Sequence, residues 1–236
     1  MSKRFFKGAA FLLFLAIVPM MFPGCLGVFG NNAAYSDIEG YSDVQKAKKL
    51  YTELDSGHFY MQDNESCEVT VEFVFKYRSD GKLTYYYMGS EGDDVYYEFH
   101  NGSELDHKKK GEKEWQFESQ GGEKYVVYDR RNRHPYTEEG VISMNAYAVT
   151  GSKLEETGDG GKKITFYYDP EEFKESLSML GELKSFECTV WLNGEGYCYR
   201  LDQKGVFDNE GKDEVSDYSM FIDGMNEIEE VKRPEV

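Results

Sequence analysis

The sequence predicts an α+β domain in which an antiparallel sheet dominates. Residues 42–54 carry apolar side chains at helical spacing, whereas residues 67–77 alternate between apolar and polar side chains. Later apolar runs are short, and the connections between them are rich in Gly, Asp, Ser and Lys, as hairpins require. Because these runs follow one another closely, a sequential antiparallel meander is the simplest topology.

The start of the chain has the pattern of an export signal. A basic segment precedes an uncharged apolar stretch, residues 9–22, which is shorter than the roughly 20 residues that a membrane-spanning helix needs. The pair Gly24-Cys25 then resembles the lipobox of bacterial lipoproteins, in which the cysteine sulfur is lipid-modified and the signal is cut just before it. The two residues before Gly24 are larger than the small aliphatic residues usual there. A signal-anchor with an incidental cysteine is the alternative.

The charge of the chain argues against two classes of partner. There are 27 basic and 44 acidic residues, and three of the basic ones lie in the export signal. The exported part therefore has a net charge near −20. Such a surface repels nucleic acid and anionic lipid headgroups, so we expect neither as a partner through charge.

Three regions are predicted: a signal peptide at 1–24, a lipid anchor and flexible tether at 25–41, and a single β-rich domain at 42–236. The last is long enough for one sizeable core. An amphipathic helix opens it, with Ser42 as the N-cap and Gly57 as the stop.

The strand predicted at 67–77 places its odd positions on a buried face and its even positions, Val74 excepted, on a solvated face. The turn Asp80-Gly81 follows it. Further strands are predicted at 83–88, 95–100, 114–119, 124–128 and 162–168, then a hairpin of 186–192 with 197–201, and a last strand or pair of strands within 219–231.

Residues 130–152 are harder to interpret. Positive charge gathers at Arg130, Arg131, Arg133 and His134 in an otherwise acidic chain. The stretch 141–149 fits a strand or a short helix equally well.

A second helix is predicted at 169–181. Asp169 can cap it, Pro170 suits its first position, and Glu172 completes a capping box. The apolar side chains that share one face of this helix are Phe173, Leu177 and Leu180.

This order of elements resembles that of the LolA/LppX-like lipoproteins. The residues that carry the resemblance are Leu50, Leu54, Gly57 and Phe59 at the first helix-to-strand junction, together with 69–75 and 220–234. The resemblance covers most of the exported chain. It implies a curved antiparallel half-barrel meander with two or three helices packed on its concave face.

The same resemblance implies that the space between sheet and helices can hold lipid acyl chains. By this analogy the cavity candidates are Phe73, Phe75, Trp191 and Leu177, the last on a helix that would form part of a lid. The 19 Tyr and 16 Phe of the chain can line such a cavity, or they can fill it as ordinary core.

No catalytic or metal-binding motif is found in the sequence. The four histidines, at 58, 100, 107 and 134, lie on separate predicted elements, without metal-ligand spacing. The acidic turns at 91–94 and 208–213 lack EF-hand spacing, and there is no nucleophile elbow or phosphate loop. We therefore expect no catalytic residues, no metal and no cofactor.

Three cysteines remain beyond Cys25, so at most one disulfide can close within the domain. Strand alternation places Cys67 and Cys188 on buried faces, and Cys198 on the same face as Arg200 and Asp202. We therefore expect Cys188 and Cys198 to be unbonded, and buried reduced thiols are the default.

The predicted protein is a monomer on the extracytoplasmic side of the cell membrane, held there by lipid on Cys25. It carries a lipid or another apolar ligand, or else it has a filled core and binds a protein or glycan partner through its surface. A hydrolase is the least favoured class. An apolar cavity would favour the carrier, and a filled core with an exposed aromatic patch would favour the surface module.

The lipobox predicts acylation at Cys25. A Cys25→Ser variant should lose all incorporation of labelled lipid and should remain unprocessed or be released from the membrane, because the acceptor sulfur is gone. Metabolic labelling and membrane fractionation measure this. Unchanged labelling of the variant would contradict the assignment.

Overall fold

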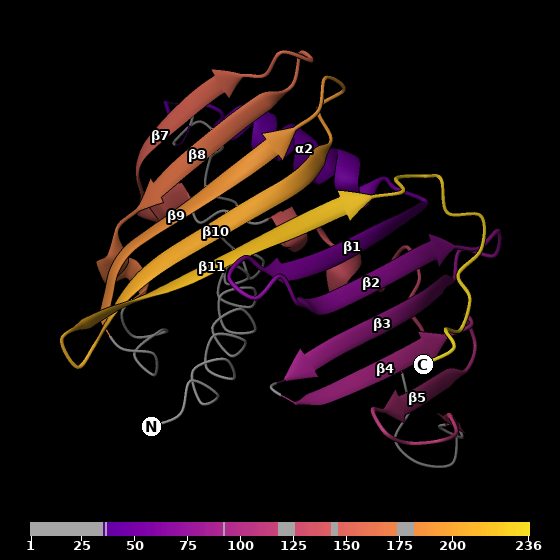
Figure 1. Cartoon of the computed structure of the whole chain (residues 1–236). Helices are drawn as coiled ribbons and strands as arrows, with labels where there is room; N and C mark the ends of the chain where they lie inside the picture. Colours follow the sequence, from indigo (N-terminus) through magenta and orange to yellow (C-terminus); the bar gives the residue numbers. More distant parts are fainter. Residues whose placement is uncertain (1–34, 36, 92, 118–125, 143–145, 174–181) are drawn as a thin grey trace.

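The computed structural model describes residues 35, 37–91, 93–117, 126–142, 146–173 and 182–236 (Figure 1). Its helical elements are α2 (Tyr41–Thr52) and the 3₁₀ helices η3 (Pro135–Thr137), η4 (Glu139–Ile142), η5 (Ala146–Ala148) and η6 (Pro170–Phe173). Its strands are β1 (Ser56–Asp63), β2 (Val69–Tyr77), β3 (Leu83–Glu91), β4 (Asp94–His100), β5 (Leu105–Lys109), β6 (Gln116–Phe117), β7 (Val149–Glu156), β8 (Lys162–Tyr168), β9 (Glu182–Leu192), β10 (Cys198–Asn209) and β11 (Lys212–Asp223).

All the strands belong to one antiparallel sheet of 11 strands, in the order β6-β5-β4-β3-β2-β1-β11-β10-β9-β8-β7. The expected sequential meander is therefore only half right. Two meanders, β1 to β6 and β7 to β11, each follow chain order, but they join through the first and last strands. The β1–β11 pair has His58 opposite Asp223 at one end and Asp63 opposite Tyr218 at the other.

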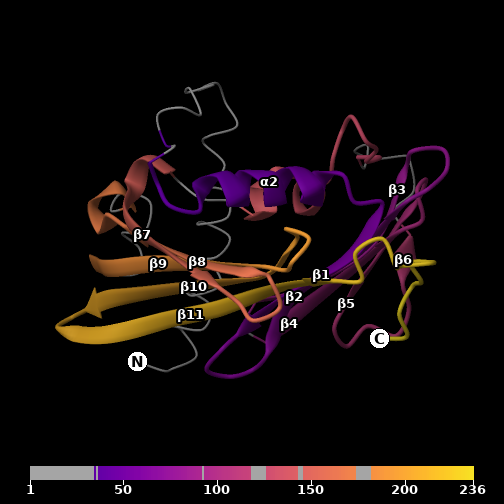
Figure 2. The same ribbon diagram turned by 90° about the horizontal axis from the view of Figure 1, so that it is seen from above.

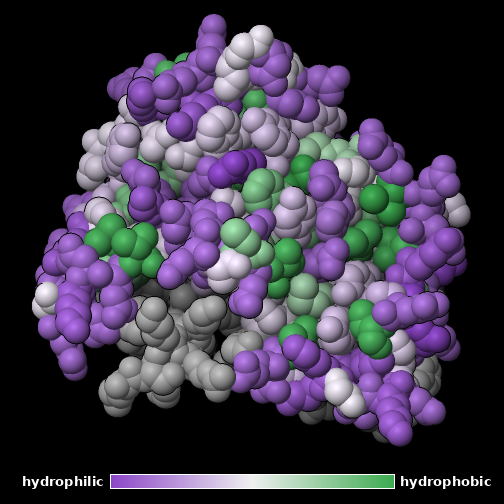
Figure 3. Space-filling view, in the orientation of Figure 1, coloured by the Kyte–Doolittle hydropathy of each residue, from purple (hydrophilic) through white to green (hydrophobic). Residues whose placement is uncertain are grey.

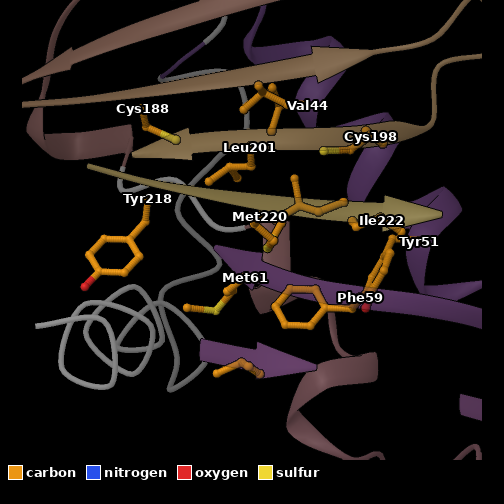
Figure 4. Close-up of a cluster of buried hydrophobic side chains, with 14 of the residues drawn as sticks. Val44, Tyr51, Phe59, Met61, Cys188, Cys198, Leu201, Tyr218, Met220 and Ile222 are labelled. Carbon is orange, nitrogen blue, oxygen red and sulfur yellow. The ribbon is translucent and has the colours of Figure 1, made fainter. Parts of the chain in front are cut away.

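The sheet is open and curved. Seen from above, its two halves run at an angle to each other, and α2 lies across one face (Figure 2). We call this the inner face and the opposite one the outer face. A continuous buried cluster joins α2 to inner-face side chains of both halves. Figure 4 shows part of it, with side chains from neighbouring strands that include Phe59, Met61, Met220 and Leu201.

The predicted first helix is confirmed as α2, which buries Val44, Ala47 and Tyr51, but it ends at Thr52, and Gly57, its predicted stop, lies in β1. Burying Val44 alone stabilises the fold by roughly 1.5 to 3 kcal/mol. Its N-cap is not Ser42 but Gly40, which has φ +80° and packs so tightly that an added Cβ would lie 2.4 Å from Ile164 Cγ2. The close contact with β8, together with the left-handed backbone, sets the start of the helix.

The alternation predicted for β2 is confirmed from Val71 onward, where Val71, Phe73, Phe75 and Tyr77 are buried. It is wrong at Cys67, which is exposed and has φ +58°, in a turn before the strand begins. Backbone hydrogen bonds within that turn, including Cys67 N to Asp63 O at 2.8 Å, take precedence over the strand pattern.

Other predicted elements have mixed outcomes. β8 has the predicted bounds, and both the turn at Gly81 (φ +82°) and the hairpin between β9 and β10 are present. Within the predicted strand 124–128, the described residues 126–128 are not strand, and Tyr128 O accepts a hydrogen bond from Leu83 N at 2.9 Å. The predicted second helix begins as η6, and its residues 174–181 lie outside the described part. β1, β5 and β7 were not predicted.

The Cys198 prediction is also wrong. A register shift between Cys198 and Arg200 in the β9–β10 ladder changes the phase of the strand, so Cys198 is buried while Arg200 faces outward. The thiol is a buried free cysteine, as is Cys188, and burial raises the pKa of both thiols.

The last strand ends at Asp223, earlier than predicted, and the chain then runs without regular structure past β1 to the ends of β2 to β5 (Figure 1). Polar contacts hold this segment: Asn226 N donates to Ser56 O at 2.9 Å, and Lys76 Nζ donates to Ile228 O at 2.6 Å. Val231 is buried within it.

The alternation in β2 predicts that the same substitution at adjacent positions lowers the free energy of unfolding by very different amounts. Val71 is 3% exposed, so Val71→Asp places an unpaired charge in the core and should cost several kcal/mol of unfolding free energy. Thr70→Asp, on the half-exposed face, should cost under about 1 kcal/mol. Urea unfolding of the two variants measures this, and equal losses would show that the strand phase is wrong.

Candidate ligand-binding site

Residues 130–142, which include η3 and η4, lie over the inner face at the C-terminal end of α2. We call them the cover segment. Arg130 Nη1 donates to Leu54 O at 2.9 Å, and Arg133 Nη1 donates to Thr52 O at 2.7 Å. Tyr51 Oη donates to Tyr136 O at 2.5 Å. The positive charge seen in the sequence thus fastens the cover segment to the carbonyl end of the helix.

Beneath the cover segment, four rings of the sheet form what we call the ring platform. These rings are Phe59 on β1, Phe73 on β2, and Tyr85 and Tyr87 on β3. The register places Phe59 opposite Phe73, and Phe73 opposite Tyr87, so their side chains share the inner face. Phe59, Phe73 and Tyr85 are at most 3% exposed.

Two side chains of the cover segment lie on this platform. The Tyr136 ring is 5.2 Å from Phe73, 5.3 Å from Phe59 and 5.8 Å from Tyr87, measured between centroids. The His134 ring stacks on Phe73 at 4.6 Å and tilts against Tyr85 at 4.8 Å. Contacts of this kind contribute roughly 0.5 to 1.5 kcal/mol each beyond area burial.

His134 is held as a neutral imidazole. Its Nδ1 accepts a hydrogen bond from Tyr136 N at 3.2 Å, so the ring proton is on Nε2. Burial, with a smaller contribution from nearby His100, lowers the pKa of His134 to about 3. Burial also lowers the pKa of His100, which stacks on Tyr85 at 5.4 Å.

A carboxylate lies beside the same rings. Glu98 on β4 is directly opposite Tyr87, so it also faces inward. Burial raises the pKa of Tyr87, Tyr128 and Tyr136, and the negative charge of Glu98 contributes further to each shift. The site therefore combines aromatic faces, phenol hydroxyls and one acidic side chain.

The residues predicted for a ligand site do not all come together. Phe73 and Phe75 lie on the inner face, 5.8 Å apart between ring centroids, and both are fully buried. Leu177, like Cys25, lies outside the described residues. Trp191 lies on the outer face, where its Nε1 donates to Asp202 Oδ2 at 2.8 Å.

The outer face around Trp191 is a network of paired side chains. Arg200 Nε donates to Asp202 Oδ1 at 2.7 Å, and Lys163 Nζ lies 4.9 Å from the Trp191 ring centroid. The ring of Phe221, in turn, stacks on Tyr60 at 4.9 Å. Space-filling shows this face as mostly hydrophilic with scattered apolar groups (Figure 3).

A hollow of about 350 Å³ lies at the other end of the sheet, over β8 to β10, away from the ring platform. Its lining includes Tyr167, Phe186 and Val206, but also Lys184 and Lys204. Tyr167, Glu187 and Lys204 are cross-strand neighbours on the outer face, so this hollow is not the predicted cavity between sheet and helices.

Sequence reasoning missed most of this site. Tyr85 and Tyr87 could have been found, because they alternate within the predicted strand 83–88. His134 and Tyr136 gave no periodic signal, since they lie on short turns. Within the described ranges, no group of three or more His, Cys, Asp or Glu side chains is arranged to hold a metal ion. Nor does that part of the chain contain a helix long and apolar enough to cross a membrane.

The depressed pKa of His134 predicts an acid-sensitive cover. Because the unfolded imidazole protonates near its ordinary pKa of about 6.5 and the folded one only near 3, the unfolded state binds the proton first as pH falls. His134 should therefore reduce stability progressively below pH 6.5, by up to about 1.4 kcal/mol per pH unit. His134→Phe keeps a ring but removes this dependence. Urea unfolding between pH 7 and pH 4.5 measures both slopes, and identical slopes would contradict the prediction.

No family model matches the sequence, and no curated protein matches it either. Among solved structures, LprF from Mycobacterium bovis aligns at 15% identity with a TM-score of 0.43, covering 82% of this chain and 95% of that one. The lipoprotein LppX from Mycobacterium tuberculosis aligns at 15% identity with a TM-score of 0.45, covering 81% and 97%. Neither likeness identifies what this chain binds. The chain is thus similar in structure to solved proteins that include LppX, as the resemblance noted in the sequence predicted.

Proposed function

We propose that this chain is a lipid-anchored, extracytoplasmic and monomeric protein. In this proposal the curved sheet is a half-barrel, and an apolar or amphiphilic ligand binds on its inner face, on the ring platform. The anchor is Cys25, and the domain follows a tether at 25–41. The cover segment occupies the ligand position while the protein is empty.

One observation carries the proposal. The most aromatic part of the inner face is covered by short 3₁₀ turns, whereas α2 packs on the core as a regular helix. Such turns have poorer hydrogen-bond geometry than an α-helix and seldom exceed a few residues. The proposal requires that these turns open locally at a lower free energy than the core of the sheet.

The chemistry of the platform suits such a ligand. Pockets for apolar molecules are lined mainly by aromatic and aliphatic side chains, with a few polar groups that fix orientation. Here Phe59 and Phe73 supply the apolar surface, while the hydroxyl groups of Tyr85 and Tyr87 and the carboxylate of Glu98 supply polar positions. An acyl chain would bury the same rings that Tyr136 and His134 now bury.

A second function, a surface module for a protein or glycan, is favoured by a different observation. The described inner face is filled in this conformation, since Phe59, Phe73, Phe75 and Phe166 are all fully buried. Half-exposed Trp191 and Arg200 on the outer face are residue types enriched at interfaces. In that case no conformation of the protein takes up an apolar probe.

Probe binding separates the two functions. If a closed cover competes with the ligand, Tyr136→Ala should raise the affinity for an uncharged fluorescent apolar probe about tenfold for each 1.4 kcal/mol by which the closed state is weakened. The same change should lower the melting temperature. Fluorescence titration and thermal melts of the purified domain measure the two effects.

Tyr147→Ala is the matched control, because it is the same substitution at a residue that is 61% exposed and lies off the platform. It should leave both quantities unchanged. If neither the wild-type domain nor Tyr136→Ala takes up the probe, ligand binding on the inner face is wrong and the surface module remains.

A further inference from the structure

His134 is enclosed by aromatic rings on several sides. Its ring centroid lies 4.6 Å from Phe73, 4.8 Å from Tyr85, 4.7 Å from Tyr128 and 5.5 Å from Tyr136. The Phe73 and Tyr136 rings stack on it, whereas the Tyr128 ring meets it edge to face. An imidazole therefore occupies a ring-walled position about the size of one small organic group.

Most of these walls do not belong to the cover segment. Phe73 and Tyr85 are inner-face residues of β2 and β3. Tyr128 precedes the cover segment, and its carbonyl oxygen is bonded to Leu83 N at the start of β3. If the cover segment moves away, the position of His134 remains lined by these three rings, with Tyr87 beside them.

Glu98 brings negative charge to this position, whereas the positive charge of Lys82 acts on His100 at the edge of the cluster. Glu98 faces the same side of the sheet opposite Tyr87, and its field acts on the hydroxyl groups of Tyr87 and Tyr128. The two imidazoles of the cluster are uncharged at neutral pH, because burial lowers the pKa of His134 and of His100. Of the arginines in the cover segment, Arg130 and Arg133 are bound to the carbonyl oxygens of Leu54 and Thr52, and Arg131 is exposed.

Aromatic faces carry negative potential and attract cations, and boxes of such faces recognise quaternary ammonium groups. A carboxylate beside the box adds a counter-ion. An anionic headgroup would meet both the ring faces and Glu98 unfavourably, and a neutral one would gain from neither.

We propose that the ring cluster of Phe73, Tyr85, Tyr87 and Tyr128 binds the quaternary ammonium group of an amphiphile, with Glu98 as its counter-ion. The position is the one that the His134 imidazole fills in the empty protein. This rests on the proposed function, because the alkyl chain of the amphiphile would lie on the rest of the ring platform.

Three probes with the same alkyl chain test it: dodecyltrimethylammonium, dodecanoate and dodecyl maltoside, each below its micelle concentration. Calorimetric titration of the wild-type protein in 150 mM salt should give an affinity for the ammonium probe about tenfold or more above that for the other two. Tetramethylammonium chloride should compete with the ammonium probe, and sodium chloride at equal ionic strength should not. This competition needs no variant.

Variants separate the site from the overall acidity of the protein. Glu98→Gln should remove most of the tenfold preference. Glu195→Gln changes net charge equally at an exposed turn residue and should leave the preference intact. Circular dichroism checks that both variants are folded.

The outcomes distinguish this inference from the proposed function. If no probe binds, ligand binding on the inner face is wrong, and this inference falls with it. If all three probes bind with equal affinity, or if Glu195→Gln weakens the preference as much as Glu98→Gln, inner-face binding stands and ammonium recognition is wrong.

Discussion

The pairing of β1 with β11 is the constraint on which the rest of the structure depends. These strands lie near the two ends of the described chain, and their antiparallel ladder joins two meanders into one sheet. On the outer face, His58 of β1 contacts Asp223 of β11 at 2.9 Å and Glu72 of β2 at 3.1 Å. These carboxylates raise the pKa of His58 against the opposing effect of its burial. Without this seam neither half could complete the inner face.

The seam also explains why the inner face is covered in two different ways. The halves of the sheet run at an angle, so a single straight helix follows only part of the surface (Figure 2). α2 packs its regular apolar face on the core. The cover segment, which is distant in sequence, lies next to the C-terminal end of α2 and extends over the ring platform. Tyr51 belongs to both, because its ring is core and its hydroxyl binds the Tyr136 carbonyl. Opening of the cover segment is thereby tied to the last turn of the helix.

Local sequence patterns predicted the features that depend on residues close in the chain, such as strand bounds, turns and the buried face of a strand. The bounds of β8, the turn at Gly81 and the burial of Phe73 and Phe75 all follow from short-range pattern. The β1–β11 pairing has no local signal, since it depends on a register between residues more than 150 positions apart. Among the residues of the site, the rings that lie on strands could be predicted from the alternation of side chains between the two faces of a strand. His134 and Tyr136 were not, because 3₁₀ turns have no extended period and their side chains are placed by tertiary contacts.

A filled inner face is compatible with ligand binding when the side chains that fill it can move away and a ligand can take their place. The rings of Phe73 and Phe75 belong to strands whose backbone hydrogen bonds run on both sides, so they stay in place. His134 and Tyr136 sit on turns whose own backbone bonds are few. The arginine hydrogen bonds of the cover segment end on the carbonyls of Thr52, at the end of α2, and of Leu54 just beyond it, which water can also satisfy. Ring-on-ring contacts hold the cover segment closed together with buried Ile142 and the hydrogen bond from the Tyr77 hydroxyl to Thr137 Oγ1. In the proposal, an amphiphile that offers equal apolar area meets the same rings, and the charge that it brings to Glu98 adds to the balance between the closed and the occupied state.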